Sequence, residues 1–224
     1  MPLLKNSARF LLIASLFVLI SCQSNVSSLS EGKAPADVSD TFAKPKLSEV
    51  KSPEIRKILE SANKQTETTT SYTQKYYTID YPNGDVPKET GACTDVIIRA
   101  FRAAGVDLQK EVHEDMRANF SKYPQKWGLS GPDTNIDHRR VPNLQTFFER
   151  RGKDLPVSDN GETYEPGDVV TWDLDGKGMT HTGLVSNIWS DESKRYLIIH
   201  NIGRGARLED RLFDWKVTGH YRYF

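Results

Sequence analysis

The order of its secondary-structure patterns constrains this chain more than any other feature. Amphipathic helical periodicity occurs before about residue 152, and β-branched or aromatic runs with turn signals follow it. Helices that come first and strands that come afterwards are typical of an α+β domain. We therefore expect an α+β fold in which N-terminal helices pack on a C-terminal antiparallel sheet.

The helices and strands can be located from local signals. One helix is expected to open with Ser52 as its N-cap and Pro53 in its first turn, and another to begin at Cys93. Two more helices are expected over DLQKEVHEDMRANFSKY and from about residue 142 to 151. The expected strands are PGDVVTWDL, MTHTGLVSNIW, KRYLIIHNIG and TGHYRYF, with a hairpin turn at Asp175-Gly176 between the first two.

The N-terminus has the pattern of an exported lipoprotein. Basic residues precede an apolar run from Phe10 to Ile20, which is shorter than the roughly 20 apolar residues of a membrane-spanning helix. The run ends in Leu-Ile-Ser-Cys, so we expect residues 1–22 to be a lipoprotein signal peptide whose Cys22 carries fatty acids such as palmitate. The alternative is an ordinary signal peptide with an incidental cysteine.

The segment that follows indicates where the protein works. Gln23, rather than Asp, follows the cysteine, which in a Gram-negative cell indicates an outer-membrane lipoprotein facing the periplasm. Residues 23–50 are rich in Ser, Lys, Ala and Pro, so we expect a disordered tether before a folded domain of residues 51–224. Lys+Arg and Asp+Glu balance at 30 each, so the charge favours no nucleic-acid partner.

Cys93 is the second of two cysteines, and an acylated Cys22 leaves it without a partner. A free thiol in an oxidising compartment is either buried and inert or retained for its chemistry. The N–H groups and dipole of a helix N-terminus favour a thiolate, so we expect an accessible Cys93 with a lowered pKa. A nucleophile also needs a base, and His181 and His200 lie in two of the expected strands.

A Cys–His–His site has two alternatives. One is a zinc site, because Cys93, His181 and His200 would supply the three protein ligands of a catalytic zinc ion. Thiolate chemistry explains a cysteine at a helix start without a metal, so we expect neither metal nor cofactor. Asn201 lies on the opposite strand face from His200, so only one of them can meet His181. We expect His200 there and Asn201 capping the following turn.

The motifs resemble a known group of enzymes. GACTDVIIRAFRAAGVDLQ, EPGDVVTWD, HTGLVS and IIHNIG resemble, in order and spacing, the papain-like NlpC-type cysteine peptidases of bacterial cell walls. YPNGDVP, CTDVIIRAFR, NIDHRRVPNL, GDVVTW, HNIG and GHYRYF more closely resemble the bacterial family of domain of unknown function 1287, from about residue 75 to 224. The resemblance implies a papain-like fold with Cys93 as nucleophile, His181 as base and His200 as orienter.

Other residues are candidates for binding the substrate. In NIDHRRVPN, a two-pronged arginine fork suits a substrate carboxylate, and a structural ion pair with a helix cap is the alternative. Asp95 stands with Thr94 where NlpC-type enzymes commonly have Ser-Gly, a departure that bears on specificity. The candidate substrate-binding residues are Asp95, Asp137, His138, Arg139, Arg140 and Trp172.

The resemblance and the expected location together imply a function. They imply an envelope-anchored cysteine amidase or endopeptidase, a hydrolase of the thiol-protease type, that cleaves amide bonds in peptidoglycan stem peptides. One alternative is a non-catalytic module that binds a wall peptide or an envelope protein. Another is an acyltransferase or transpeptidase that uses the same Cys–His pair.

Overall fold

The computed structural model of the chain describes residues 50–224. The expected signal peptide, the lipid-carrying Cys22 and all but the last residue of the expected tether lie outside the described residues. Within residues 50–224, none of the helices is both long and apolar enough to cross a bilayer.

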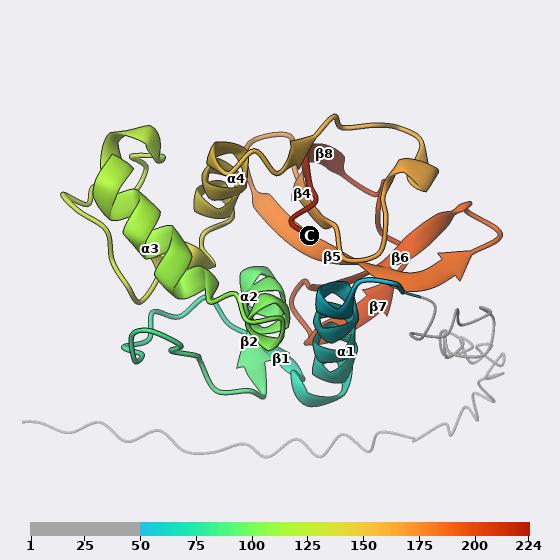
Figure 1. The fold of residues 1–224 in the computed structure, drawn as a ribbon, viewed down its shortest axis with the longest axis horizontal. Helices are drawn as coiled ribbons and strands as arrows, with labels where there is room; N and C mark the ends of the chain where they lie inside the picture. Colours follow the sequence, from blue (N-terminus) through green and yellow to red (C-terminus); the bar gives the residue numbers. More distant parts are fainter. Residues whose placement is uncertain (1–49) are drawn as a thin grey trace, which may run out of the picture. The chain divides into compact units, whose positions relative to one another are not determined.

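The described part has helices first and a sheet afterwards, so the α+β prediction is confirmed (Figure 1). The α-helices are α1 (Pro53–Thr68), α2 (Cys93–Ala103), α3 (Leu108–Asn119) and α4 (Val141–Arg150). Short 3-10 helices are η3 (Phe120–Lys122), η4 (Asp137–Arg139) and η5 (Gly161–Thr163). The strands are β1 (Ser71–Tyr72), β2 (Thr90–Gly91), β3 (Asp154–Leu155), β4 (Val169–Asp173), β5 (Thr180–Ser190), β6 (Arg195–Asn201), β7 (Ala206–Glu209) and β8 (Lys216–Tyr221).

Six of these strands form one antiparallel sheet in the order β3-β8-β4-β5-β6-β7. The two outermost strands, β3 and β7, were not predicted. The predicted hairpin between β4 and β5 is present, and Gly176 in its loop has a φ of 69°, which a glycine adopts without strain. Strands β1 and β2 form a separate parallel pair just before α2.

The sheet has two buried faces with different partners. Val169, Leu184 and Ile199 belong to the same core cluster as residues of all four α-helices, so we call theirs the helix face. The alternate residues, including Val170 and Val185, pack with Tyr164, Leu212 and neighbouring aromatic residues on what we call the far face. Because strand side chains alternate, each candidate on the strands is assigned to one face.

Helix α2 is the central helix of the described domain. It contacts α1, α3, β5 and β6, and Figure 1 shows it between α1 and α3 beside the sheet. Its core-facing apolar residues, including Val96, Ile97 and Phe101, are almost completely buried. Its N-cap, Ala92, has no side-chain acceptor, but the carboxylate of Asp95 accepts the Ala92 N–H at 2.6 Å. This bond fixes where the helix begins, and therefore where Cys93 lies.

Candidate active site

Cys93 is the first residue of α2 and opens on a cleft. The side chain is only 5% exposed, but it lines a cavity of about 470 Å³. The walls come from separate parts of the chain: the segment at β1, the start of α2, the loop before η4, the start of α4 and the β4–β5 loop. Their residues are Tyr72, Gln74, Ala92, Lys126, Trp127, Ile136, Arg139, Arg140, Val141, Pro142, Gly178 and Thr180.

The expectation of an accessible thiol with a lowered pKa is wrong. Burial is the largest influence and raises the pKa of Cys93 to about 11. The backbone N–H groups of Thr182, Thr94 and Cys93 itself lower this pKa, and the nearby Asp95 carboxylate raises it. The helix N-terminus therefore favours the thiolate as expected, but less than burial opposes it. The free protein holds a neutral thiol at physiological pH.

Alkylation by iodoacetamide should reveal this protonation state. The rate at Cys93, followed by mass spectrometry of its peptide, should be half-maximal near pH 11 in the native protein. The unfolded protein is the control and should show the ordinary thiol value of about 8.5. A native half-point below the unfolded one would restore the thiolate interpretation.

His181 and His200 lie in contact, as predicted. His181 Nε2 and His200 Nδ1 are 2.8 Å apart, and both rings are buried on the far face of the sheet. Asn201 is on the helix face, so the choice of His200 over Asn201 as the neighbour of His181 is confirmed. On its other side, His200 Nε2 lies 3.0 Å from a carboxylate oxygen of Glu209, a residue that sequence reasoning missed.

The Glu209 carboxylate determines which ring nitrogens carry protons. Its hydrogen bond to His200 is the largest of the influences that lower the pKa of Glu209 to about 2, so the carboxylate is ionised and only accepts. His200 Nε2 must then donate to it, and in the tautomer that carries its proton on Nε2 the other nitrogen, Nδ1, is an acceptor. His181 Nε2 therefore donates to His200, and the lone pair of His181 lies on Nδ1.

His181 Nδ1 is the nitrogen at the end of this chain of hydrogen bonds. It has no hydrogen-bond partner within residues 50–224, yet it is not one of the fully enclosed polar atoms there. Burial, followed by the neighbouring His200, lowers the pKa of His181 to about 3, so the ring is neutral. Trp172 stacks on it with ring centroids 5.7 Å apart.

The backbone on either side of His181 lies near Cys93 where β5 leaves β6. These strands pair from Leu184↔Ile199 onward, and the backbone N–H of Thr182, two residues before this pairing, faces the Cys93 thiol. Thr180 lines the cleft that contains the thiol. In the sequence, His181 therefore stands between one residue that lines the cleft and one whose backbone faces the thiol. Within the described residues, no hydrogen bond joins the thiol to the imidazole. The catalytic roles of Cys93, His181 and His200 thus stay predictions.

The side chains that were expected to bind a substrate carboxylate mostly form structural ion pairs within the protein. Arg139 Nε and Nη2 each donate to the Asp95 carboxylate at 2.9 Å, and Nη1 donates to the Lys75 carbonyl at 3.0 Å. These donors are therefore unavailable to a substrate, although part of the Arg139 side chain lines the cleft. Asp137 is buried and accepts from Arg140 at 2.9 Å. The alternative of a structural ion pair describes Asp95, Asp137 and Arg139.

Two other candidates do not line the cleft. Trp172 is fully buried on the far face, and its Nε1 donates to the Leu212 carbonyl at 2.8 Å. It is a neighbour of His181 rather than a substrate ligand, because strand alternation places it with Val170. His138 is buried, and burial is the main reason why its pKa is lowered to about 3. Of the six candidates, Arg139 and Arg140 line the cleft, and Arg140 is the one whose Nε and Nη2 have no hydrogen-bond partner within residues 50–224.

The expected role of Asn201 is also corrected. Its Nδ2 donates to the carbonyls of Ser71 at 3.1 Å and Gly91 at 2.9 Å, rather than capping the turn after β6. The end of β6 is thereby tied to β1 and β2, directly before Cys93. The zinc alternative finds no support in the geometry, since no three His, Cys, Asp or Glu side chains of residues 50–224 are grouped to hold a metal ion.

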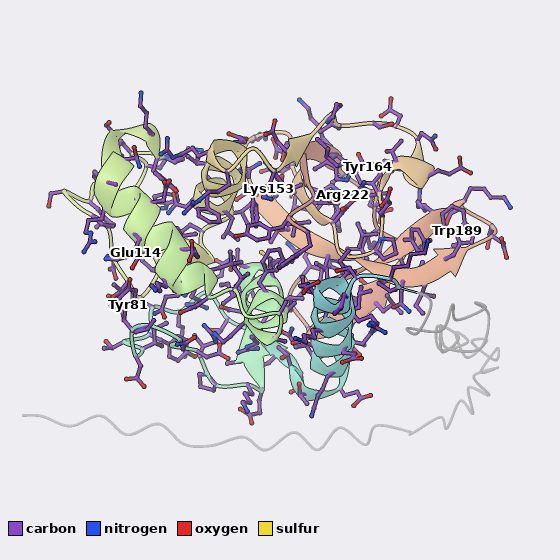
Figure 2. The ribbon with its side chains drawn as sticks, in the orientation of Figure 1. Tyr81, Glu114, Lys153, Tyr164, Trp189 and Arg222 are labelled. Carbon is purple, nitrogen blue, oxygen red and sulfur yellow. The ribbon has the colours of Figure 1, made fainter. Side chains whose placement is uncertain are left out.

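A second histidine–carboxylate pair explains other motif residues. His220 Nε2 lies 2.7 Å from Asp168, whose carboxylate also accepts from Arg222 Nε and Nη2 at 2.8 Å. Tyr164 stacks on His220 at 4.2 Å, and Figure 2 labels Tyr164 and Arg222 near strand β8. None of these four residues lines the cleft, so GDVV and GHYRYF contain structural residues.

A family model and a curated relative match this chain. Residues 59–223 match the family described as domain of unknown function (DUF1287). The uncharacterized protein YijF of Escherichia coli (strain K12) is 53% identical over 167 residues, which are 75% of this chain and 80% of YijF. A solved structure of NlpC1 from Trichomonas vaginalis is similar, with a TM-score of 0.40 and 13% identity over 80% of this chain. The chain spans about half of that protein, 48% of its length.

Proposed function

This chain belongs to the family of domain of unknown function 1287, and we propose that it is a cysteine hydrolase that cleaves an amide bond of an envelope peptide. Stem peptides of peptidoglycan are the proposed substrate. One observation carries the proposal: a thiol at a helix N-terminus opens on a cleft, and the cleft residue Thr180 directly precedes a histidine that is hydrogen-bonded to a second histidine and, through it, to a carboxylate. Nucleophile, base and orienter are the three parts that covalent catalysis needs.

The first step starts from a neutral thiol and a neutral imidazole. When the substrate fills the cleft, the thiol and His181 Nδ1 come within hydrogen-bond reach, a contact that often tightens only in the complex. The proton of Cys93 Sγ passes to Nδ1 as sulfur forms a bond to the amide carbonyl carbon. The resulting oxyanion accepts hydrogen bonds from N–H groups at the start of α2. His200 and the Glu209 carboxylate stabilise the imidazolium.

The second half returns the proton. The carbon–nitrogen bond breaks, the imidazolium gives its proton to the leaving amine, and a thioester on Cys93 remains. His181 Nδ1 then takes a proton from water, whose oxygen attacks the thioester, and the imidazolium reprotonates the departing sulfur. The net reaction adds one water across one amide bond. An amine that replaced this water would give the acyltransferase alternative.

The envelope location is part of this proposal. It rests on the apolar run that ends in Leu-Ile-Ser-Cys, with Cys22 as the acylated residue and residues 23–50 as the tether. Cells grown with a radioactive fatty acid should label the wild-type protein and not Cys22→Ala. Equal labelling of the two would refute the anchor and leave the chemistry at Cys93 to be judged separately.

The Glu209 interaction leads to a test of the relay. Glu209→Ala should slow turnover by about tenfold to a hundredfold, since outer partners of a functional histidine have effects of this size. His200 would then be free to reverse its tautomer, and His181 Nδ1 would lose its fixed lone pair. Nitrogen chemical shifts of the two rings should accordingly show Nε2–H tautomers in the wild type and a mixture in the variant.

The adjacent carboxylate provides a matched control. Asp210→Asn removes a charge next along the chain, but that carboxylate pairs with Arg195 rather than with His200. It should leave both turnover and the ring nitrogen shifts unchanged. Wild-type shifts and turnover in Glu209→Ala would contradict the relay.

A further inference from the structure

The cleft above Cys93 has a one-sided charge. Three cationic residues line it, Lys126, Arg139 and Arg140, and no Asp or Glu lies among its lining residues. Arg139 is neutralised by Asp95 and has its donors engaged. Lys126 is exposed and forms no ion pair within residues 50–224. The cleft therefore presents net positive charge to whatever occupies it.

Arg140 is held in place with one donor edge free. Its Nη1 donates to the buried Asp137 carboxylate at 2.9 Å, and its guanidinium lies 4.0 Å from the centroid of the Trp127 ring. Its side chain is 17% exposed. Nε and Nη2 have no hydrogen-bond partner within residues 50–224 and are not among the fully enclosed polar atoms.

The same edge binds a carboxylate elsewhere in this protein. Arg139 uses Nε and Nη2 to bind Asp95. Arg222 uses the same two atoms to bind Asp168, and Arg150 uses them to bind Asp115. Two parallel N–H donors match the two oxygens of a carboxylate. In Arg140 this edge is unfilled at the wall of a cleft that contains the thiol.

We propose that the cleft selects substrates that carry a free carboxylate besides the scissile amide. Arg140 binds the carboxylate through Nε and Nη2, Lys126 adds a second positive charge at the rim, and the 37%-exposed Trp127 supports the Arg140 guanidinium. The inference rests on the proposed function for the amide and adds the substrate class. The carboxylate is either a peptide C-terminus or an acidic side chain, and these two sources are separable.

Binding to the full-length Cys93→Ala protein tests the inference without turnover. Three probes are acetylated tripeptides: one neutral and amidated, one neutral with a free C-terminal carboxylate, and one amidated with a central glutamate. Calorimetry should show that at least one of the two carboxylate peptides binds about tenfold or more tightly than the neutral peptide. The peptide that binds more tightly tells whether the cleft recognises a C-terminal carboxylate or an acidic side chain. The preference should weaken as salt is raised.

Substitutions assign the preference to named residues. Adding Arg140→Gln should reduce the preference to near unity, and Lys126→Gln, which alters an exposed unpaired side chain, should reduce it severalfold. Arg151→Gln is the matched control because this arginine lies outside the cleft lining, and it should leave the preference intact. Circular dichroism verifies that each variant is folded. If Arg140→Gln does not fold, the effect of Lys126→Gln on the preference is sufficient to test the inference.

The two proposals fail in different ways. Equal affinity for all three peptides, or no binding of any at millimolar concentration, overturns the carboxylate inference. So does a preference that survives both Arg140→Gln and Lys126→Gln. Carboxylate-dependent binding without hydrolysis by the wild type would instead leave the inference standing and overturn the proposed hydrolase.

Discussion

Replacing Cys93 by alanine should reduce the release of peptidoglycan fragments to the background rate. The expected loss is at least about a thousandfold, because residues 50–224 contain no other cysteine that could form the thioester. The variant should still fold, since only one buried sulfur atom is removed from a site at the start of α2. The measurement is incubation of the purified protein with purified peptidoglycan, with soluble fragments identified by mass spectrometry and folding monitored by circular dichroism.

The variants around Cys93 separate the possible outcomes. His181→Ala should lose a similar amount of turnover, since it removes the base, while Asp210→Asn should retain it. Fragments whose masses reflect added water support a hydrolase, and fragments joined to an added amine support an acyltransferase. Wild-type protein that binds peptidoglycan but releases nothing would favour the non-catalytic binding module. Full activity of folded Cys93→Ala would remove the thiol from the mechanism.

The helices were predictable because their signals are local. Ser52 was expected to cap α1, and its hydroxyl accepts the Ile55 N–H at 3.2 Å. Strands β3 and β7 were not predictable, because they are the two edges of the sheet. An edge strand can be short and polar, since backbone pairing with one neighbour suffices. The two strands have two and four residues, and neither contains the β-branched and aromatic residues that mark β4 and β5.

The alternation of side chains along a strand was enough to choose between His200 and Asn201, but it could not identify the Glu209 carboxylate. His200 and Asn201 differ in face by one step of the alternation, and the structure has them on opposite faces as expected. Glu209 reaches His200 only through the β6–β7 register, in which His200 pairs with Arg207 and Ile198 with Glu209. That register depends on the unpredicted strand β7, so the sequence contains no direct signal for Glu209.

The pKa of Cys93 was wrongly predicted because two opposing effects differ in size. A helix N-terminus contributes up to about 2 kcal/mol in favour of a thiolate. Full burial can shift a pKa by about 3–5 units, or roughly 4–7 kcal/mol, in the opposite direction. A position at a helix start is visible in the sequence, whereas burial beneath Thr182 depends on how β5 packs. The weaker effect was therefore the one that could be inferred.

Replacing Arg139 by methionine should destabilise the protein by about 3–5 kcal/mol, the expected loss when one partner of a buried ion pair is removed. The side chains of Arg139 and Asp95 are only 2% and 3% exposed, so the remaining carboxylate cannot recover its hydration. The affected region includes the start of α2, because Asp95 also accepts the Ala92 N–H. Chemical denaturation measures the change in the free energy of unfolding, provided that the dependence of this free energy on denaturant concentration is the same in both proteins.

Two comparisons test this explanation of the Arg139 effect. Arg151→Met breaks an ion pair with Glu111 whose side chains are 45% and 36% exposed, and it should cost less than about 1 kcal/mol. Adding Asp95→Asn to Arg139→Met should recover part of the loss, because the amide oxygen can still accept from Ala92 while no unpaired charge stays buried. Similar losses for Arg139→Met and Arg151→Met would show that burial does not control the strength of this pair. A double variant less stable than Arg139→Met would show that the stranded carboxylate is not the source of the loss.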